Sequence, residues 1–178
     1  MLDNLLKWSI MQFGKLDYQL VKINLNELIE DSIKLFAPNI LKKNISIETA
    51  LSVTHVTADH HRLGAIMQNL ISNAIKYTYA NGKVIVTAEE KEEYIEICVS
   101  DMGIGMSKKT QNNLFKIEHS HSILGTEGER GTGLGLILCK ELIESKGGKI
   151  WVESKVGKGS KFIFSIPLYS WIKYPPLN

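Results

Sequence analysis

The chain has 178 residues, of which 44% are hydrophobic, so it can form one domain of ordinary size with a real core. The formal net charge of +2 and the scattered lysines do not favour nucleic acid as a partner, and we expect none. Cys98 and Cys139 have no neighbours suited to a metal cluster or a disulfide framework, and both are interpreted as buried thiols. No apolar run reaches the roughly 18 residues that span a bilayer, and residues 1–8 lack a signal pattern. We therefore expect a cytoplasmic setting and no membrane contact by this segment.

The first part of the chain combines helical and strand patterns. Residues 2–13 have the apolar spacing of a short amphipathic helix, which Gly14 would end. A helical pattern over residues 25–41 can be capped by Asn24 or Asn26, and Pro38 inside it predicts a kink or a break into two helices. Short strands are predicted on either side of this pattern, at residues 18–23, 45–51 and 53–57.

Residues 59–78 form the clearest helical pattern, with Asp59 as its cap. Its apolar residues recur at the spacing of a core-facing stripe: Leu63, Ile66, Met67, Leu70, Ile71, Ala74 and Ile75. Four polar or aromatic residues project together from another flank: Asn69, Asn73, Lys76 and Tyr77. Amides beside a cation suit an oxyanion and its metal, although a solvated polar face is the alternative from this helix alone.

The second half predicts two hairpins around a helix. Asn81-Gly82 is a turn signal, and two β-rich runs after it form the first hairpin. A polar span over residues 116–131 has no periodicity, and we expect it to be mobile. The helix that follows, at 131–146, has Leu134, Leu138, Leu142 and Ile143 on its predicted inner side. The remaining predicted elements are strands at 83–88, 94–100, 149–155 and 160–168 and a short helix at 107–115.

This order predicts an α+β fold. Two consecutive hairpins favour a two-layer α/β sandwich, in which helices cover one face of a mixed, mainly antiparallel sheet.

Two glycine-rich segments could accompany the polar helix flank. Asp101 precedes Gly103 and Gly105 at a predicted strand end, and Gly131, Gly133 and Gly135 stand where a helix begins. Glycine permits close approach to a ligand, and the free N–H groups of a first helical turn attract phosphate. Taken singly, such segments also serve as tight turns, and Asp101 suits an Asx turn. The second segment matches neither the dinucleotide fingerprint nor a P-loop.

Together these segments resemble the catalytic ATP-binding domain of bacterial sensor histidine kinases, in the superfamily shared with DNA gyrase, Hsp90 and MutL. The resemblance covers about residues 25–168 and implies the Bergerat-type ATP-binding fold. The matching motifs are the N box at 69–78, the glycine boxes at 101–105 and 131–136, a counterpart of the phenylalanine box at 113–115, and the closing hairpin at 147–154 and 157–162.

The resemblance implies ATP and Mg²⁺ as ligands. Asn73 would coordinate the metal with Asn69 nearby, Lys76 would face phosphate, and Asp101 would accept from the adenine amino group. Residues 116–130 would be the ATP lid, although Lys116 and Arg130 have no clear counterparts because the usual lid start is absent. The other residues placed in the ATP site by the resemblance are Tyr77, Gly103, Gly105, Met106, Phe115, Gly131, Thr132, Gly133, Leu134 and Gly135.

The resemblance also implies an organisation and partners. Residues 1–14 would be the remnant of a dimerisation helix, 15–168 the catalytic domain and 169–178 a C-terminal tail. The γ-phosphate would pass to a histidine on a dimerisation domain of a homodimeric kinase, and then to a response regulator. None of the five histidines fits the acceptor pattern, and His55, His60, His61, His119 and His121 are interpreted as solvated or structural. A related conformational ATPase and a non-catalytic nucleotide-binding module are the alternatives.

Overall fold

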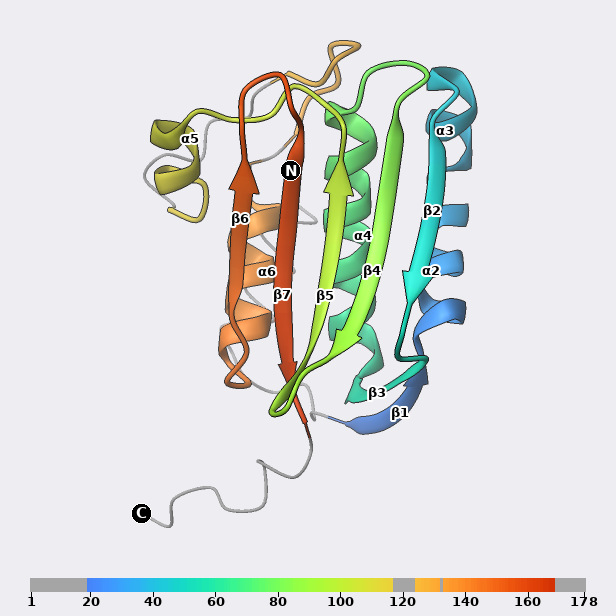
Figure 1. Ribbon diagram of the computed structural model, residues 1–178, viewed down its shortest axis with the longest axis vertical. Coiled ribbons are helices and arrows are strands. Elements are labelled where there is room, and N and C mark those ends of the chain that lie inside the picture. The colour runs from blue at the N-terminus through green and yellow to red at the C-terminus, as the bar shows by residue number, and fades with distance from the viewer. Residues whose placement is uncertain (1–18, 117–123, 132, 169–178) are drawn as a thin grey trace.

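The computed structural model describes residues 19–116, 124–131 and 133–168 (Figure 1). A five-stranded sheet forms one layer, and α2, α4 and α6 cover one of its faces. The elements are β1 (Leu20–Asn24), α2 (Leu25–Lys34), α3 (Ala37–Lys43), β2 (Ser46–Leu51), β3 (His55–Asp59), α4 (His60–Tyr77), β4 (Lys83–Glu90), β5 (Tyr94–Asp101), α5 (Lys108–Asn113), α6 (Gly135–Glu144), β6 (Ile150–Ser154) and β7 (Ser160–Pro167).

The sheet has the strand order β2-β4-β5-β7-β6. Only β2 and β4 pair in parallel, while β4 with β5, β5 with β7 and β6 with β7 are antiparallel. The predicted fold class, an α+β sandwich with a mainly antiparallel sheet, is therefore confirmed. Strands β1 and β3 form a separate antiparallel pair, which the sequence patterns did not indicate.

Helix α4 packs its apolar stripe between the sheet and the neighbouring helices. All seven residues of the predicted stripe are buried, and Met67, Leu70 and Ile71 are completely enclosed. Burying one such side chain stabilises the fold by about 1.5–3 kcal/mol. The Asp59 side chain accepts a hydrogen bond from the backbone N–H of Arg62 at 2.9 Å, so the predicted cap is confirmed.

The helical pattern around Pro38 is divided into two helices, as predicted. Pro38 lies in the first turn of α3, where its missing N–H is not needed. The Asn24 side chain caps α2 by accepting from the backbone N–H of Asn26 at 3.0 Å.

Three details of the sequence prediction are wrong. Helix α6 begins at Gly135 rather than at Gly131, because Gly133 has φ +75°, which no α-helix accommodates. Of its predicted inner residues, Leu142 and Ile143 are buried and Leu138 packs against the core, but Leu134 is only partly buried, and the buried residues Ile137 and Cys139 had not been predicted. The third detail is Cys98, which is also only partly buried. It alternates with the buried residues Ile97 and Val99 and therefore lies on the opposite face of the sheet.

Several expectations lie outside the described residues: the helix at 2–13, the tail at 169–178, and residues 117–123 of the polar span, which include His119 and His121. The domain boundaries therefore stay a prediction. Among the described helices, none is both long and apolar enough to cross a membrane.

Candidate nucleotide site

A cavity of about 450 Å³ opens between α4, the end of β5, α5 and the segment that leads into α6. It brings together three segments that are far apart in sequence: the α4 flank, the residues after β5, and residues 130–136. Its lining consists of Asn69, Ser72, Asn73, Lys76, Tyr77, Asp101, Ile104, Gly105, Met106, Lys109, Thr110, Asn113, Leu114, Arg130, Gly131, Gly133, Gly135, Leu136, Ser160 and Phe162.

Asp101 is the buried carboxyl group of this cavity, with only 4% of its surface exposed. Burial raises its pKa from 3.8 to about 6, although backbone N–H donors at Gly103 and Ser160 act in the opposite direction. The Gly103 N–H donates to Asp101 Oδ1 at 2.9 Å. A buried carboxylate held by backbone donors is a fixed acceptor for a ligand N–H group.

The backbone after Asp101 lies directly against the end of α4. The Ile104 N–H donates to the Tyr77 carbonyl at 3.2 Å. A Cβ atom on Gly103 would collide with that same carbonyl oxygen, so this position requires glycine. Gly103 itself does not line the cavity, but its close approach brings Asp101 and Tyr77 to one wall.

The polar flank of α4 also lines the cavity. Asn69 donates from Nδ2 to the Ala65 carbonyl at 2.9 Å, which leaves Oδ1 to face the start of α6. There, a Cβ atom on Gly135 would meet Asn69 Oδ1. The Lys76 ammonium lies 4.7 Å from the centre of the Tyr77 ring, a cation–π contact that holds both side chains at the rim.

The structure does not place every expected residue on the cavity surface. Gly131, Gly133 and Gly135 line it, as do Gly105 and Met106. Leu134 does not, and Thr132 lies outside the described residues.

Phe115 is also absent from the lining. It is partly buried and packs against the hydrophobic core, whereas its neighbours Asn113 and Leu114 reach the cavity.

Sequence reasoning missed an apolar wall and several polar groups. Ile104, Leu136 and Phe162 provide apolar surface, and their sequence patterns cannot be distinguished from those of ordinary core residues. Ser160 was missed because its place beside Asp101 depends on the β5–β7 register, which the sequence does not reveal. The remaining residues missed are Ser72, Lys109, Thr110, Asn113 and Leu114, and Arg130 had been left without a role.

The side chains that line the cavity could hold a metal ion only if an anionic ligand supplied further oxygen atoms. Among the described residues, no three His, Cys, Asp or Glu side chains gather in a way that could hold a metal ion. Asn69 and Asn73 supply amide oxygens, which Mg²⁺ accepts when phosphate oxygens and water complete its coordination. Lys76, Lys109 and Arg130 add positive charge around the same space.

Known proteins that resemble this chain agree with a cavity suited to an anionic ligand and a metal ion. The sequence profile of the family described as histidine kinase-, DNA gyrase B-, and HSP90-like ATPase matches residues 58–170. The solved catalytic domain of the histidine kinase ThkA is 34% identical, with a TM-score of 0.72, over 84% of this chain and 95% of that domain. The chain belongs to the catalytic ATP-binding domains of histidine kinases.

Longer histidine kinases contain a similar segment. Sensor histidine kinase GacS of Pseudomonas protegens is 34% identical over 180 residues, which cover 94% of this chain and 19% of GacS. ThkA in a crystal structure with the response regulator protein TrrA is 30% identical, with a TM-score of 0.71, over 93% of this chain and 47% of ThkA. This histidine kinase domain thus spans about a fifth of the length of GacS.

Proposed function

We propose that this domain binds MgATP in the cavity and positions the γ-phosphate for transfer to a histidine. The observation that carries the proposal is the convergence of Asp101, the amide flank of α4 and the glycines before α6 on one cavity. Asp101 suits an adenine amino group, the glycines before α6 suit a triphosphate, and the amides of α4 suit a metal.

Asp101 would accept from the exocyclic amino group of adenine. The apolar side chains of Ile104, Leu136 and Phe162 would enclose the base, because they line the same cavity as the carboxylate. A pKa of about 6 favours the ionised form of the carboxyl group at neutral pH. It can therefore act as a charged acceptor for the amino group.

The phosphates would extend towards the α4 flank and the glycine segment. Lys76 would contribute charge, and the first N–H groups of α6, which begins at Gly135, would donate to phosphate oxygens. Asn73 would hold Mg²⁺ and Asn69 would stand beside it. The metal would neutralise phosphate charge, and such electrostatic stabilisation, together with positioning, is what phosphoryl transfer mainly needs.

The acceptor would be a histidine on a dimerisation domain of the same homodimeric kinase, and a response regulator would receive the phosphoryl group next. The ThkA–TrrA complex supports a regulator as partner, because that kinase contains a similar domain. None of the residues proposed for the site is a covalent nucleophile, so this domain would position ATP while the acceptor histidine attacks the γ-phosphorus.

Nucleotide binding is tested by calorimetry with ATP in the presence and absence of Mg²⁺. We expect ATP binding that strengthens with Mg²⁺ and that Asn73→Ala weakens. Absence of ATP binding by the wild-type chain would refute the proposal.

Transfer is tested with γ-labelled ATP and a histidine-containing dimerisation domain supplied in trans. Label that is acid-labile and alkali-stable on the acceptor is the expected result. Release of inorganic phosphate without labelled protein would instead favour a conformational ATPase, and ATP binding without either product would favour a non-catalytic nucleotide module.

A further inference from the structure

Lys43 is a buried cation at the end of α3, with 1% of its side chain exposed. Its ammonium group donates to the carbonyl oxygens of Ile75 at 3.0 Å, Lys76 at 2.9 Å and Thr78 at 3.4 Å. These carbonyls belong to the C-terminal end of α4, where backbone acceptors lack partners within the helix. The positive charge also opposes the negative end of the helix dipole.

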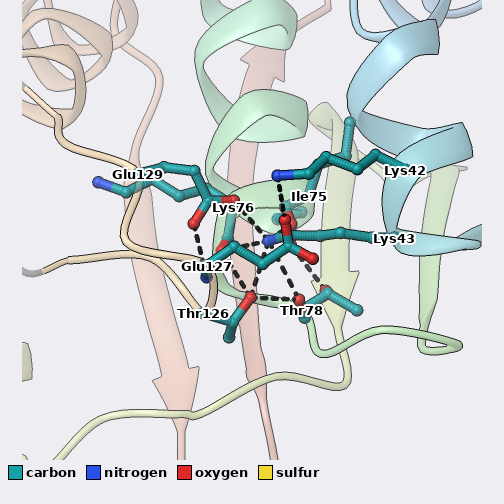
Figure 2. A network of polar contacts seen from close by, with 9 residues as sticks. Lys42, Lys43, Ile75, Lys76, Thr78, Thr126, Glu127 and Glu129 are labelled. Carbon is teal, nitrogen blue, oxygen red and sulfur yellow. Dashed lines mark hydrogen bonds and ion pairs between the residues drawn. The ribbon is translucent and has the colours of Figure 1, made fainter.

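The same ammonium group holds a second segment, residues 124–131. It donates to Thr126 Oγ1 at 2.7 Å and forms an ion pair with Glu129 Oε1 at 2.6 Å. Figure 2 shows Lys42 and Lys43 extending from α3 towards Thr126, Glu127 and Glu129. Five oxygens from two distant parts of the chain thus surround one nitrogen.

The Glu129 carboxyl group is held in its ionised form by the contact with Lys43. Burial acts to raise the pKa of its carboxyl group, but the hydrogen bond and charge of Lys43, with backbone donors at Glu127 and Glu129, outweigh it and lower the pKa. Glu129 therefore remains ionised opposite Lys43. Lys43 is enclosed whereas Glu129 is partly exposed, so loss of Glu129 would leave the buried ammonium group without its counter-charge.

Both sides of this contact continue into walls of the nucleotide cavity. Lys76, whose carbonyl accepts from Lys43, also lines the cavity. Glu129 is followed directly by Arg130 and Gly131, which line the same cavity. Thr126 strengthens the junction, because its N–H donates to the Lys76 carbonyl at 3.1 Å and its hydroxyl to the Thr78 carbonyl at 2.9 Å.

We propose that Lys43 is a positioning residue for the phosphate end of the site, although it does not line the cavity. It fastens residues 126–129 to the end of α4 and so fixes the distance between Lys76 and the Arg130–Gly131 wall. The inference rests on the proposed function, since it assigns Lys43 to the affinity for the triphosphate. We expect adenine binding at Asp101 to change little, because none of the five oxygens around the Lys43 ammonium belongs to Asp101 or to the residues that directly follow it.

The test compares Lys43→Met with Lys42→Met in the 178-residue chain. Lys42 is an ideal neighbour for a control, because it pairs with Glu127 at 2.6 Å but is largely exposed. Calorimetry with MgATP and with adenosine measures the two ends of the site separately. We expect Lys43→Met to weaken MgATP binding at least about tenfold and adenosine binding by less than about twofold. Lys42→Met should leave both affinities within about twofold of wild type.

A second pair of variants keeps the test valid if Lys43→Met does not fold. Glu129→Gln removes the partner charge at a partly exposed position, and Glu127→Gln is its control. Thermal unfolding of every variant establishes that the affinities belong to folded protein. Glu129→Gln should weaken MgATP binding selectively, and Glu127→Gln should not.

The outcomes separate this inference from the proposed function. Selective loss of MgATP affinity in Lys43→Met or Glu129→Gln supports the positioning role. Unchanged MgATP affinity in these folded variants, or an equal loss of MgATP and adenosine affinity, overturns it. If the wild-type chain binds neither ligand, the proposed function itself fails.

Discussion

Replacing Asp101 by Asn should stabilise the nucleotide-free domain while weakening its binding of adenine. The carboxyl group is buried, and its pKa is raised from 3.8 to about 6. Folding therefore disfavours the ionised form of this side chain. Asparagine has nearly the same shape and can still accept the Gly103 N–H through its amide oxygen.

The magnitude follows from the pKa. Each pH unit by which folding raises the pKa of a carboxyl group corresponds to about 1.4 kcal/mol, so the ionised side chain costs up to about 3 kcal/mol. Because the pKa is raised, this cost is absent below pH 3.8, develops between pH 3.8 and about 6, and is complete above pH 6. The Ser160 N–H forms a stronger hydrogen bond with a carboxylate than with an amide, and this loss offsets part of the gain. We therefore expect Asp101→Asn to raise the free energy of unfolding by about 1–3 kcal/mol at pH 8.

Urea unfolding of the nucleotide-free protein at pH 4, 6 and 8 measures this gain. The difference between Asp101→Asn and wild type should be largest at pH 8 and should shrink towards pH 4. The control is Asp31→Asn, because Asp31 is an exposed carboxylate of α2 that pairs with Lys34 far from the cavity. Its substitution should change the unfolding free energy by less than about 0.5 kcal/mol.

Adenosine binding at pH 8 measures the functional cost of the same substitution. A hydrogen bond to a charged acceptor contributes about 1.5–3 kcal/mol, so Asp101→Asn should lose roughly tenfold to a hundredfold in affinity. A variant that is less stable than wild type by the same amount at every pH would refute the burial argument. Unchanged adenosine affinity would refute the assignment of Asp101 to adenine.

Three further predictions concern the metal, the glycine segment and the core. Asn73→Ala should reduce the gain in ATP affinity on adding Mg²⁺ by about tenfold or more, measured by calorimetry, while adenosine affinity remains unchanged. Gly135→Ala should weaken ATP binding without unfolding the domain, because the new methyl group meets Asn69 Oδ1 at the cavity surface. An ATP affinity equal to that of wild type would show that the Asn69 side chain moves aside without effect on binding. Leu70→Ala should cost about 2–5 kcal/mol in urea unfolding, since Leu70 is completely buried on α4, and a loss below 1 kcal/mol would contradict its place in the core.

The fold was predictable where one local pattern determines one element. Asp59 and Asn24 are helix caps in the structure because a short polar side chain before an apolar period satisfies the first N–H groups. The strands β4 and β5 alternate buried and less buried residues, as a sheet covered on one face requires. The pairing of β1 with β3 was not predictable, because it depends on a register between separate segments.

The candidate site was predictable in its glycine and amide residues, together with Asp101, Lys76, Tyr77 and Met106, which adjoin them in sequence. These residue types are unusual at their positions, so they are visible in the sequence, whereas Phe162 has the same pattern as any core residue. Lys43 was missed for a different reason. In the sequence it is one of two adjacent lysines, and its burial depends on oxygens from Ile75 and Glu129, which are distant along the chain.

The two helix ends at the cavity also explain why a buried lysine is useful at this place. The N-terminal end of α6 favours a polyphosphate, but the C-terminal end of α4 carries carbonyl groups and negative dipole charge that would repel it. The Lys43 ammonium lies within hydrogen-bond distance of three of these carbonyls, and Lys76 adds a second cation in the last turn. The α4 flank can therefore present its amides to an anion and a metal, even though the helix dipole alone would make this end a poor anion site.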